Sequence, residues 1–396
     1  MSTFFVARSI RRPWRGFCVA CLLVWLFSGT LHSSDFEFLA THPDATLQTT
    51  DEGKTLHTLH GADGRLFVGY GDYSFDTGPI SLRSFEPGTS SFSDSLGQVS
   101  TEAIYRIQNA GSQVFALTTD PLVKDPGGYA AGMSGHSSTW AMNESMPFLH
   151  VFDFAASDES TLFLSGSGGP DDIFHSVVYA SGDGGSTWEL SLHANVPDGI
   201  EPGNGNFSRF YGIAELNDEM YVQQIFFRSG VAEPSSMFRF DGTDWNESPA
   251  LTTADGDWTY FIDPDEFHGS IVARDAHPGM LSPIYQFDGT DLVKLAPEGS
   301  ADTQFWDQYV EGDSIYLLTS DQRVIRSDDM IDWETLAEDV PESFRSLAVI
   351  GNDLYFGATD STLHKFSLVP EATGPLSLLC LMTLWIRHTR KLAACC

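Results

Sequence analysis

The densest group of side chains that could recognise a ligand lies in the stretch GYGDYSFDTGP, residues 69–79. Phenol rings can pack against a ligand, and carboxylates and hydroxyls can hydrogen-bond to it. Because loops on a rigid scaffold often carry function, this stretch is a candidate ligand-binding loop. The alternative interpretation is an elaborate turn between strands at 66–70 and 80–85. The side chains in question are Tyr70, Asp72, Tyr73, Asp76 and Thr77.

A set of arginines that converged in space would indicate a site for an anionic substrate. Six arginines in the body of the chain are candidates: Arg83, Arg106, Arg209, Arg228, Arg239 and Arg274. Their spacing singles out no group of three, and carboxylates are so numerous that a pair of them predicts nothing. The G-x-S-x-G, H-E-x-x-H and phosphate-loop motifs are absent. The sequence therefore predicts no catalytic residue.

Metal binding is only weakly indicated. His57 and His60 are three residues apart, and this spacing on a strand directs them to opposite faces, so they do not predict a metal pair. No D-x-[DN]-x-[DN]-G-x₅-E calcium loop occurs, and residues 255–257 (DGD) alone are a poor match. We therefore predict no cofactor. Calcium binding remains the alternative to a simply solvated acidic surface.

The charge of the chain excludes one class of partner. The 396 residues include 21 Lys and Arg against 54 Asp and Glu, which gives a formal net charge of −33. All the acidic residues lie between Asp35 and Glu371, whereas a third of the basic residues lie outside this span. A body this acidic repels nucleic acid and anionic lipid. We therefore expect no nucleic-acid partner.

The first 34 residues have the order of a secretory signal peptide. Arginines between positions 8 and 15 precede an apolar run at 17–27, and small or polar residues follow it. The run is shorter than the about 20 apolar residues that span a membrane. Residues 1–34 are therefore predicted to direct export. All five cysteines lie in this segment or from Cys380 onward, so no disulfide can form within 35–375.

Between the ends, residues 35–368 repeat a unit made of a turn and an apolar, aromatic run, as in ADGRLFVGY (62–70). Seven copies are spaced 39 to 58 residues apart, near the about 40–50 residues of a four-stranded propeller blade. The pattern predicts an all-β fold, a β-propeller of seven blades, with six or eight as alternatives. Residues 36–61 must then supply the strands that the last unit lacks. The copies align on Phe67, Phe115, Phe163, Tyr221, Val272, Tyr316 and Tyr355.

Hairpins with Asp and Gly turns follow several of these units. One of them, SGDGGSTW at 181–188, resembles the Asp-box pattern S-x-D-x-G-x-T-W, and residues 327–333 resemble a degraded second copy. The resemblance implies a structural hairpin between the outer strands of a propeller blade, away from any active site. Its side chains are expected to bond their own turn. The five defining positions are Ser181, Asp183, Gly185, Thr187 and Trp188.

The C-terminal segment, residues 369–396, resembles the PEP-CTERM sorting signal of Gram-negative bacteria that make an exosortase. It has Pro370 and Glu371, then an apolar stretch at 376–386, and then a basic cluster of Arg387, Arg390 and Lys391. It departs from the commonest form at Ala372, where that form has Pro, and in the extension 392–396. The resemblance implies that an exosortase-like membrane transpeptidase recognises Pro370 and Glu371 while a short helix lies in the inner membrane. A simple membrane anchor is the alternative.

Propellers with Asp-boxes include sialidases, which resemble one another in an arginine triad, a Tyr/Glu nucleophile pair and an acidic proton donor. The Arg-Ile-Pro stretch typical of bacterial sialidases is absent here. The sequence therefore favours an exported protein of the bacterial cell envelope or extracellular matrix, non-enzymatic, that binds a glycan or protein partner through its propeller loops. A sialidase-like glycosidase or a lyase is the alternative. Three arginines and two or three acidic side chains converging in the central channel would favour the enzyme, and a channel plugged by aromatic side chains would favour the binding protein.

Overall fold

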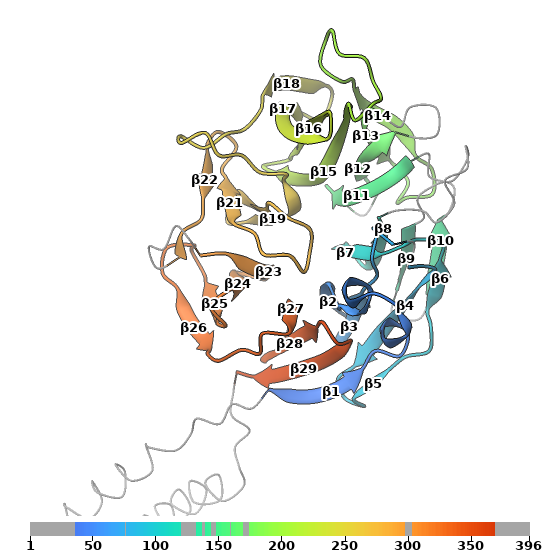
Figure 1. The fold of residues 1–396 in the computed structure, drawn as a ribbon, viewed down its shortest axis with the longest axis vertical. Helices are drawn as coiled ribbons and strands as arrows, with labels where there is room; N and C mark the ends of the chain where they lie inside the picture. Colours follow the sequence, from blue (N-terminus) through green and yellow to red (C-terminus); the bar gives the residue numbers. More distant parts are fainter. Residues whose placement is uncertain are drawn as a thin grey trace, which may run out of the picture. The chain divides into compact units, whose positions relative to one another are not determined.

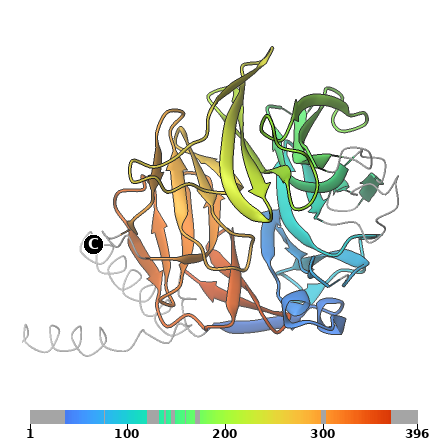
Figure 2. The ribbon, with the colours of Figure 1, turned by 45° about the horizontal axis from the view of Figure 1, so that its top comes forward.

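The computed structural model describes residues 36–368 apart from 76, 120–131, 137–138, 144–147, 159, 169–173 and 298–302. The strands of this part of the chain form seven antiparallel sheets that stand as a ring around a central axis (Figure 1, Figure 2). The fold is therefore a seven-bladed β-propeller, which confirms the predicted fold class. The predicted signal peptide and sorting signal lie outside the described residues.

In blades one to six the first strand lies innermost and the later strands follow outward in chain order, and blade seven does the same for its first three strands. Blade one contains β2 (Thr58–Ala62), β3 (Arg65–Gly69), β4 (Ile80–Glu86) and β5 (Ser91–Phe92), with β6 (Gly97–Val99) also paired to β4. Blade two contains β7 (Ile104–Ala110), β8 (Gln113–Thr118), β9 (Gly132–His136) and β10 (Thr139–Asn143). Blade three contains β11 (Phe148–Ala156), β12 (Leu162–Gly168), β13 (Ser176–Ser181) and β14 (Glu189–Ala194).

The remaining blades repeat this order. Blade four contains β15 (Phe207–Leu216), β16 (Glu219–Arg228), β17 (Val231–Phe240) and β18 (Trp245–Pro249). Blade five contains β19 (Ile262–Phe267), β20 (Ser270–Arg274), β21 (Ile284–Phe287) and β22 (Leu292–Lys294). Blade six contains β23 (Phe305–Glu311), β24 (Ser314–Thr319), β25 (Val324–Ser327) and β26 (Glu334–Ala337). Blade seven contains β27 (Phe344–Ile350), β28 (Asp353–Ala358), β29 (Thr362–Ser367) and β1 (Glu37–Thr41).

The ring is closed by a strand from the other end of the described chain. β1 pairs antiparallel with β29, so blade seven takes its outermost strand from the segment that precedes blade one. The Phe36 ring packs against Phe344, Phe356 and Phe366 in the same blade. Residues 36–61 thus divide between blade seven and the first strand of blade one, as the short last repeat requires. Closure leaves no blade incomplete at this seam.

The repeated aromatic unit of the sequence forms the second strand of every blade. The aligned positions, from Phe67 in β3 to Tyr355 in β28, are all buried. A second strand has a neighbouring blade on each face, so both faces must be apolar and the strand reads as a continuous apolar run. β12, β20 and β24 are buried at every residue. The core therefore lies between blades.

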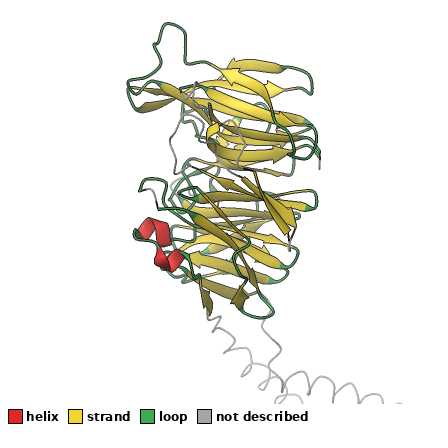
Figure 3. Ribbon diagram, turned by 90° about the vertical axis from the view of Figure 1, so that its right-hand side faces the viewer, coloured by secondary structure: helices red, strands yellow, loops and turns green. Residues whose placement is uncertain are grey.

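The two ends of the ring differ because neighbouring strands are antiparallel. Turns between first and second strands and between third and fourth strands lie at one end, which we call the hairpin face. The other connections lie at the loop face, where the 3₁₀ helix η1 (Ala45–Leu47) and helix α2 (Asp51–Lys54) occur together on one side (Figure 3). Residues 36 and 368 both lie at the hairpin face. Among the described residues, no helix is long and apolar enough to cross a membrane.

Candidate functional site

One arginine in the central channel is surrounded by three carboxylates. Arg106 extends from β7, and its Nε lies 3.1 Å from Asp153 Oδ1 while its Nη2 lies 3.0 Å from Asp265 Oδ1. Its Nη1 donates to Asp263. Burial raises the pKa of the Asp153 carboxyl to about 7, although Arg106 acts against this shift. Each of the three guanidinium nitrogens of Arg106 thus donates to an acceptor of the protein itself, so this arginine is occupied before any substrate carboxylate could reach it.

A second arginine is also paired with acceptors of the protein itself, through both of its Nη atoms. Arg274 in β20 is fully buried, and its Nη1 lies 3.1 Å from Asp307 Oδ1 on β23. Its Nη2 donates to the carbonyl oxygens of Met280 and Trp306 at 2.8 and 2.7 Å. Burial raises the pKa of Asp307 to about 8, against the effect of Arg274. Arg274 therefore acts as a structural cation between blades five and six.

The carboxylates of these two clusters also hold the next blade. Asp153 Oδ2 accepts a hydrogen bond of 2.9 Å from the backbone of Ile213 in β15. Asp307 Oδ2 accepts one of 2.8 Å from Leu347 in β27. Each aspartate thus bonds an arginine of the preceding blade and a backbone N–H of the following blade. The same Arg–Asp–backbone arrangement thus links neighbouring blades at two places in the channel, and no pattern in the sequence indicates it.

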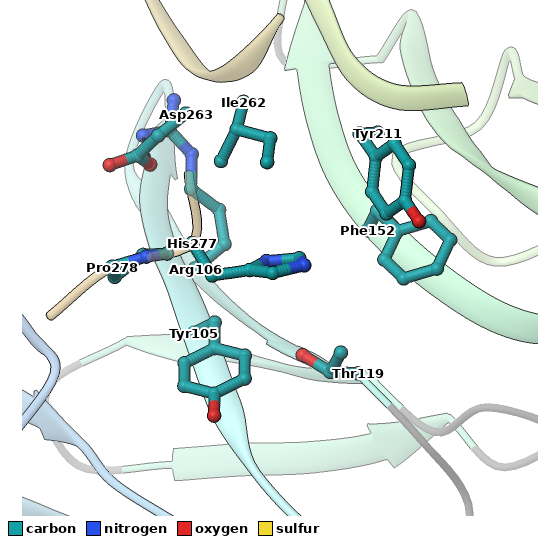
Figure 4. Close-up of a pocket in the computed structure, with 9 residues that line it drawn as sticks. All are labelled: Tyr105, Arg106, Thr119, Phe152, Tyr211, Ile262, Asp263, His277 and Pro278. Atoms are coloured by element: carbon teal, nitrogen blue, oxygen red, sulfur yellow. Dashed lines mark hydrogen bonds and ion pairs between the residues drawn. The ribbon is translucent and has the colours of Figure 1, made fainter. Parts of the chain in front are cut away.

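The loop-face mouth of the channel is filled by aromatic rings around one histidine. His277 lies on the loop 275–283 between β20 and β21, which we call the crossing loop. The His277 ring centroid lies 5.5 Å from that of Tyr73, 5.8 Å from that of Tyr105 and 5.7 Å from that of Tyr211. The remaining cavity has about 20 Å³, enough for one water molecule. Figure 4 shows its lining residues, which are Tyr105, Arg106, Thr119, Phe152, Tyr211, Ile262, Asp263, His277 and Pro278.

The predicted ligand loop contributes one side chain to this mouth. Tyr73 faces His277, but Tyr70 is 1% exposed and its hydroxyl accepts a hydrogen bond from the backbone of Ser81. Asp72 is 2% exposed and accepts hydrogen bonds from Ser74 N and Thr50 Oγ1. Tyr70 and Asp72 therefore do not line a ligand face, because the turn buries them as its own supports. Asp76 lies outside the described residues.

The residues that resemble an Asp-box form the turn between β13 and β14. Asp183 Oδ1 accepts hydrogen bonds of 2.8 Å from Ser181 Oγ and Thr187 N. Ser181 Oγ accepts one from Gly185 N, and Trp188 Nε1 donates to Gly185 O. These bonds stay within the turn, which is the arrangement that a structural hairpin needs. The turn borders a shallow groove of about 830 Å³ between blades three and four.

The other candidate residues from the sequence do not assemble into a site. Arg83 pairs with Asp44, Arg228 with Glu233 and Arg239 with Glu219. His57 is buried and His60 is half-buried, and no group of three His, Cys, Asp or Glu suited to a metal occurs in the described part of the chain. Of the six arginines, Arg209 alone lacks a carboxylate partner among the described residues.

Arg209 lies in a group of aromatic side chains that sequence reasoning missed. Its guanidinium carbon lies 4.8 Å from the Phe207 ring centre and 5.5 Å from that of Phe152. We call these rings the aromatic patch; it comprises Phe152, Phe207, Tyr211, Phe227, Trp258 and Tyr260. They come from the inner strands of blades three and four, from β16 and from the segment before β19. The signal in the sequence was the alternation FSRFY at 207–211, which places Phe207, Arg209 and Tyr211 on one side of β15.

Comparison with known proteins shows the fold and no family. No protein-family profile and no curated protein matches the chain, whereas 621 chains of solved structures match it. The Pan2 WD40 domain of Neurospora crassa is 10% identical, with a TM-score of 0.50 over 86% of this chain and 98% of that domain. An extracellular domain of a one component system from B. thetaiotaomicron is 11% identical, with a TM-score of 0.51 over 85% of this chain and 44% of that one. At such identities the similarity establishes the β-propeller alone.

Proposed function

We propose that this chain is an exported, non-enzymatic protein of the cell surface or extracellular matrix that binds a glycan or protein partner at the loop face of its propeller. The observation that carries the proposal is the aromatic patch around Arg209, beside a channel whose other arginines are neutralised. Partly buried aromatic rings with a few polar groups are the usual lining of a binding site. Longer segments of the chain gather at the same face.

The alternative, a sialidase-like glycosidase or a lyase, is less well supported by this geometry. Such an enzyme needs cationic groups that are free to hold an anionic substrate and an acid and base beside open space. Arg106 and Arg274 already contact carboxylates of the protein, and His277 with its neighbouring rings fills the mouth of the channel. A cavity of about 20 Å³ does not admit a sugar ring.

The positions at which the chain enters and leaves the propeller favour a loop face that is exposed to partners. Residues 36 and 368 leave the propeller at the hairpin face. Any attachment beyond residue 368 therefore begins on the side opposite the aromatic patch. We propose that residues 1–34 direct export and that an exosortase-like transpeptidase recognises the sorting signal at 369–396.

Binding is tested with the full-length chain, purified in mild detergent, on a glycan array and against extracellular proteins, alongside a panel of chromogenic glycosides. We expect a bound glycan or protein partner and no turnover. Turnover of any glycoside would reject the non-enzymatic proposal. Absence of every glycan and protein partner would reject the binding proposal.

The sorting proposal is tested separately in the native host. Replacement of Pro370 and Glu371 by alanine is expected to stop processing of the tail and to leave the chain with the membrane. The matched control replaces Thr373 and Gly374 by alanine, beside the Pro-Glu pair. Processing that is unchanged in the Pro370→Ala, Glu371→Ala variant would rule out exosortase recognition.

A further inference from the structure

We propose that the aromatic patch and Arg209 form a binding subsite for a neutral polysaccharide. In this subsite the apolar face of a hexopyranose ring packs on aromatic rings and the guanidinium donates hydrogen bonds to sugar hydroxyls. This inference rests on the proposed function and gives it a place and a ligand class.

The rings form a continuous surface across three blades. Phe207 stacks on Phe227 with 4.4 Å between ring centroids, and Tyr211 lies 4.6 Å from Phe152 and 5.6 Å from Tyr260. Trp258 extends this surface, 5.0 Å from Tyr260. All of these rings except Tyr211 keep part of their surface exposed. The rings other than Tyr211 can offer their exposed apolar surface to the sugar units of a chain.

Arg209 supplies donors at the centre of this surface. One hydrogen bond holds it, from Nη1 to the Tyr211 hydroxyl at 3.4 Å, and Nε is buried without a partner in the described part of the chain. A guanidinium has five N–H donors in a fixed planar fork. Because Nε is buried, the donors left for a ligand are those of Nη2 and the second N–H of Nη1, which make no hydrogen bond within the described residues. Neighbouring hydroxyls of a sugar ring fit such a fork in the way that carboxylate oxygens do.

Charge selects a neutral ligand over an acidic one. The chain carries a net charge of −33, which repels polyanions at long range. Carboxylates also flank the patch: Asp257 precedes Trp258, and Asp275 Oδ1 accepts a hydrogen bond of 2.9 Å from Tyr260 N. These oxygens can accept hydrogen bonds from sugar hydroxyls, whereas they would repel uronate groups.

The test is titration calorimetry of the full-length chain with neutral and charged polymers. The neutral probes are dextran, laminarin, mannan and xylan, and the charged probes are alginate, polygalacturonate and polylysine. We expect at least one neutral polymer to bind. Arg209→Gln and Trp258→Ala are each expected to weaken that binding at least tenfold, and Trp258→Phe should retain most of it.

A matched control separates the site from general effects of removing an arginine. Arg326 also lies over an aromatic ring, that of Tyr316 at 6.0 Å, but it pairs with Asp328 and belongs to blade six. Arg326→Gln is expected to leave affinity unchanged, and near-ultraviolet circular dichroism of every variant should match the parent.

The outcomes distinguish this inference from the proposed function. Failure of all four neutral polymers to bind, or binding that survives in the Arg209→Gln, Trp258→Phe and Trp258→Ala variants alike, would overturn the subsite. Binding of alginate, polygalacturonate or polylysine alone would also overturn it while leaving a binding protein in place. A chain that binds no polymer and no protein partner would refute both.

Discussion

At the scale of single residues, Arg106 is the centre of a buried ion cluster in the channel. It faces Asp153, Asp263 and Asp265, and removing one partner of a buried ion cluster leaves the others uncompensated. We expect Arg106→Met to lower the free energy of unfolding by about 3–5 kcal/mol. Urea denaturation at neutral pH measures this loss.

The control for that prediction is an exposed pair of the same chemistry. Arg228 and Glu233 are about half exposed, so Arg228→Ala should change the free energy of unfolding by no more than about 0.5 kcal/mol. Equal effects of the two substitutions would contradict the structural role given to Arg106.

A second prediction at the scale of single residues concerns His57. Its Nε2 lies 3.0 Å from the carbonyl oxygens of both Glu52 and Gly71, so Nε2 carries the proton of a neutral ring. Burial lowers its pKa to about 4, and hydrogen bonds to those carbonyls oppose the shift only in part. The folded pKa is below the unfolded value of about 6.5. The stability from this group is therefore full above pH 6.5 and is lost as pH falls toward 4.

Because the pKa of His57 is lowered, the parent protein and the His57→Gln variant should differ in how their stability depends on pH. Between pH 7.0 and 5.5 the parent should lose about 1 kcal/mol more of its free energy of unfolding than His57→Gln, whose amide can still donate to a carbonyl. Urea denaturation at the two pH values checks the difference. Identical pH dependence would mean that His57 titrates normally in the folded chain.

At the scale of elements, the crossing loop is held by a close approach between blades. Gly279 has φ +82°, and a Cβ at this position would lie 2.5 Å from His57 Nδ1. Gly279→Ala should therefore lift the loop away from His57. We expect faster hydrogen exchange of the amides at 275–283 and a loss of stability larger than the about 1 kcal/mol that a left-handed alanine costs.

Gly269 provides a control that isolates the cost of placing alanine in the left-handed backbone conformation. Gly269 in the turn between β19 and β20 has φ +72° and open space around its Cβ position. Gly269→Ala should cost about 1 kcal/mol and leave hydrogen exchange of the crossing loop unchanged. If Gly279→Ala behaves like Gly269→Ala, the contact with His57 does not anchor the loop.

At the scale of the whole molecule, net charge sets the response to salt. A charge of −33 destabilises the compact state through self-repulsion, and salt screens this repulsion over about 8–10 Å near 0.1–0.15 M. We expect the melting temperature to rise as NaCl increases from low to moderate concentration. An unchanged or falling melting temperature would contradict this expectation.

The same experiment tests the calcium alternative. CaCl₂ at matched ionic strength should raise the melting temperature by a similar amount if the acidic surface is simply solvated. A much larger rise at micromolar calcium would reveal a specific site. The sequence favours a solvated acidic surface, so we expect the first result.

The sequence by itself determined the architecture. Second strands such as β12 and β24 are buried on both faces, so each is a recognisable apolar run, and the interval between such runs is the length of a blade. Counting these runs predicted seven blades, and the short last repeat predicted closure by β1. The bonds within the 181–188 turn were predictable for the same reason, since they join residues at most four positions apart.

Only the tertiary structure decided which polar residues meet. Arg106 and Asp263 are 157 positions apart, and Tyr73 meets His277 across the ring. No local pattern encodes such contacts, because they depend on the angle between blades and on which side chains point inward. The stretch at 69–79 shows the consequence: its composition suggested a ligand loop, yet packing buried Tyr70 and Asp72. The same packing left Arg209, which the sequence did not single out, among partly exposed rings.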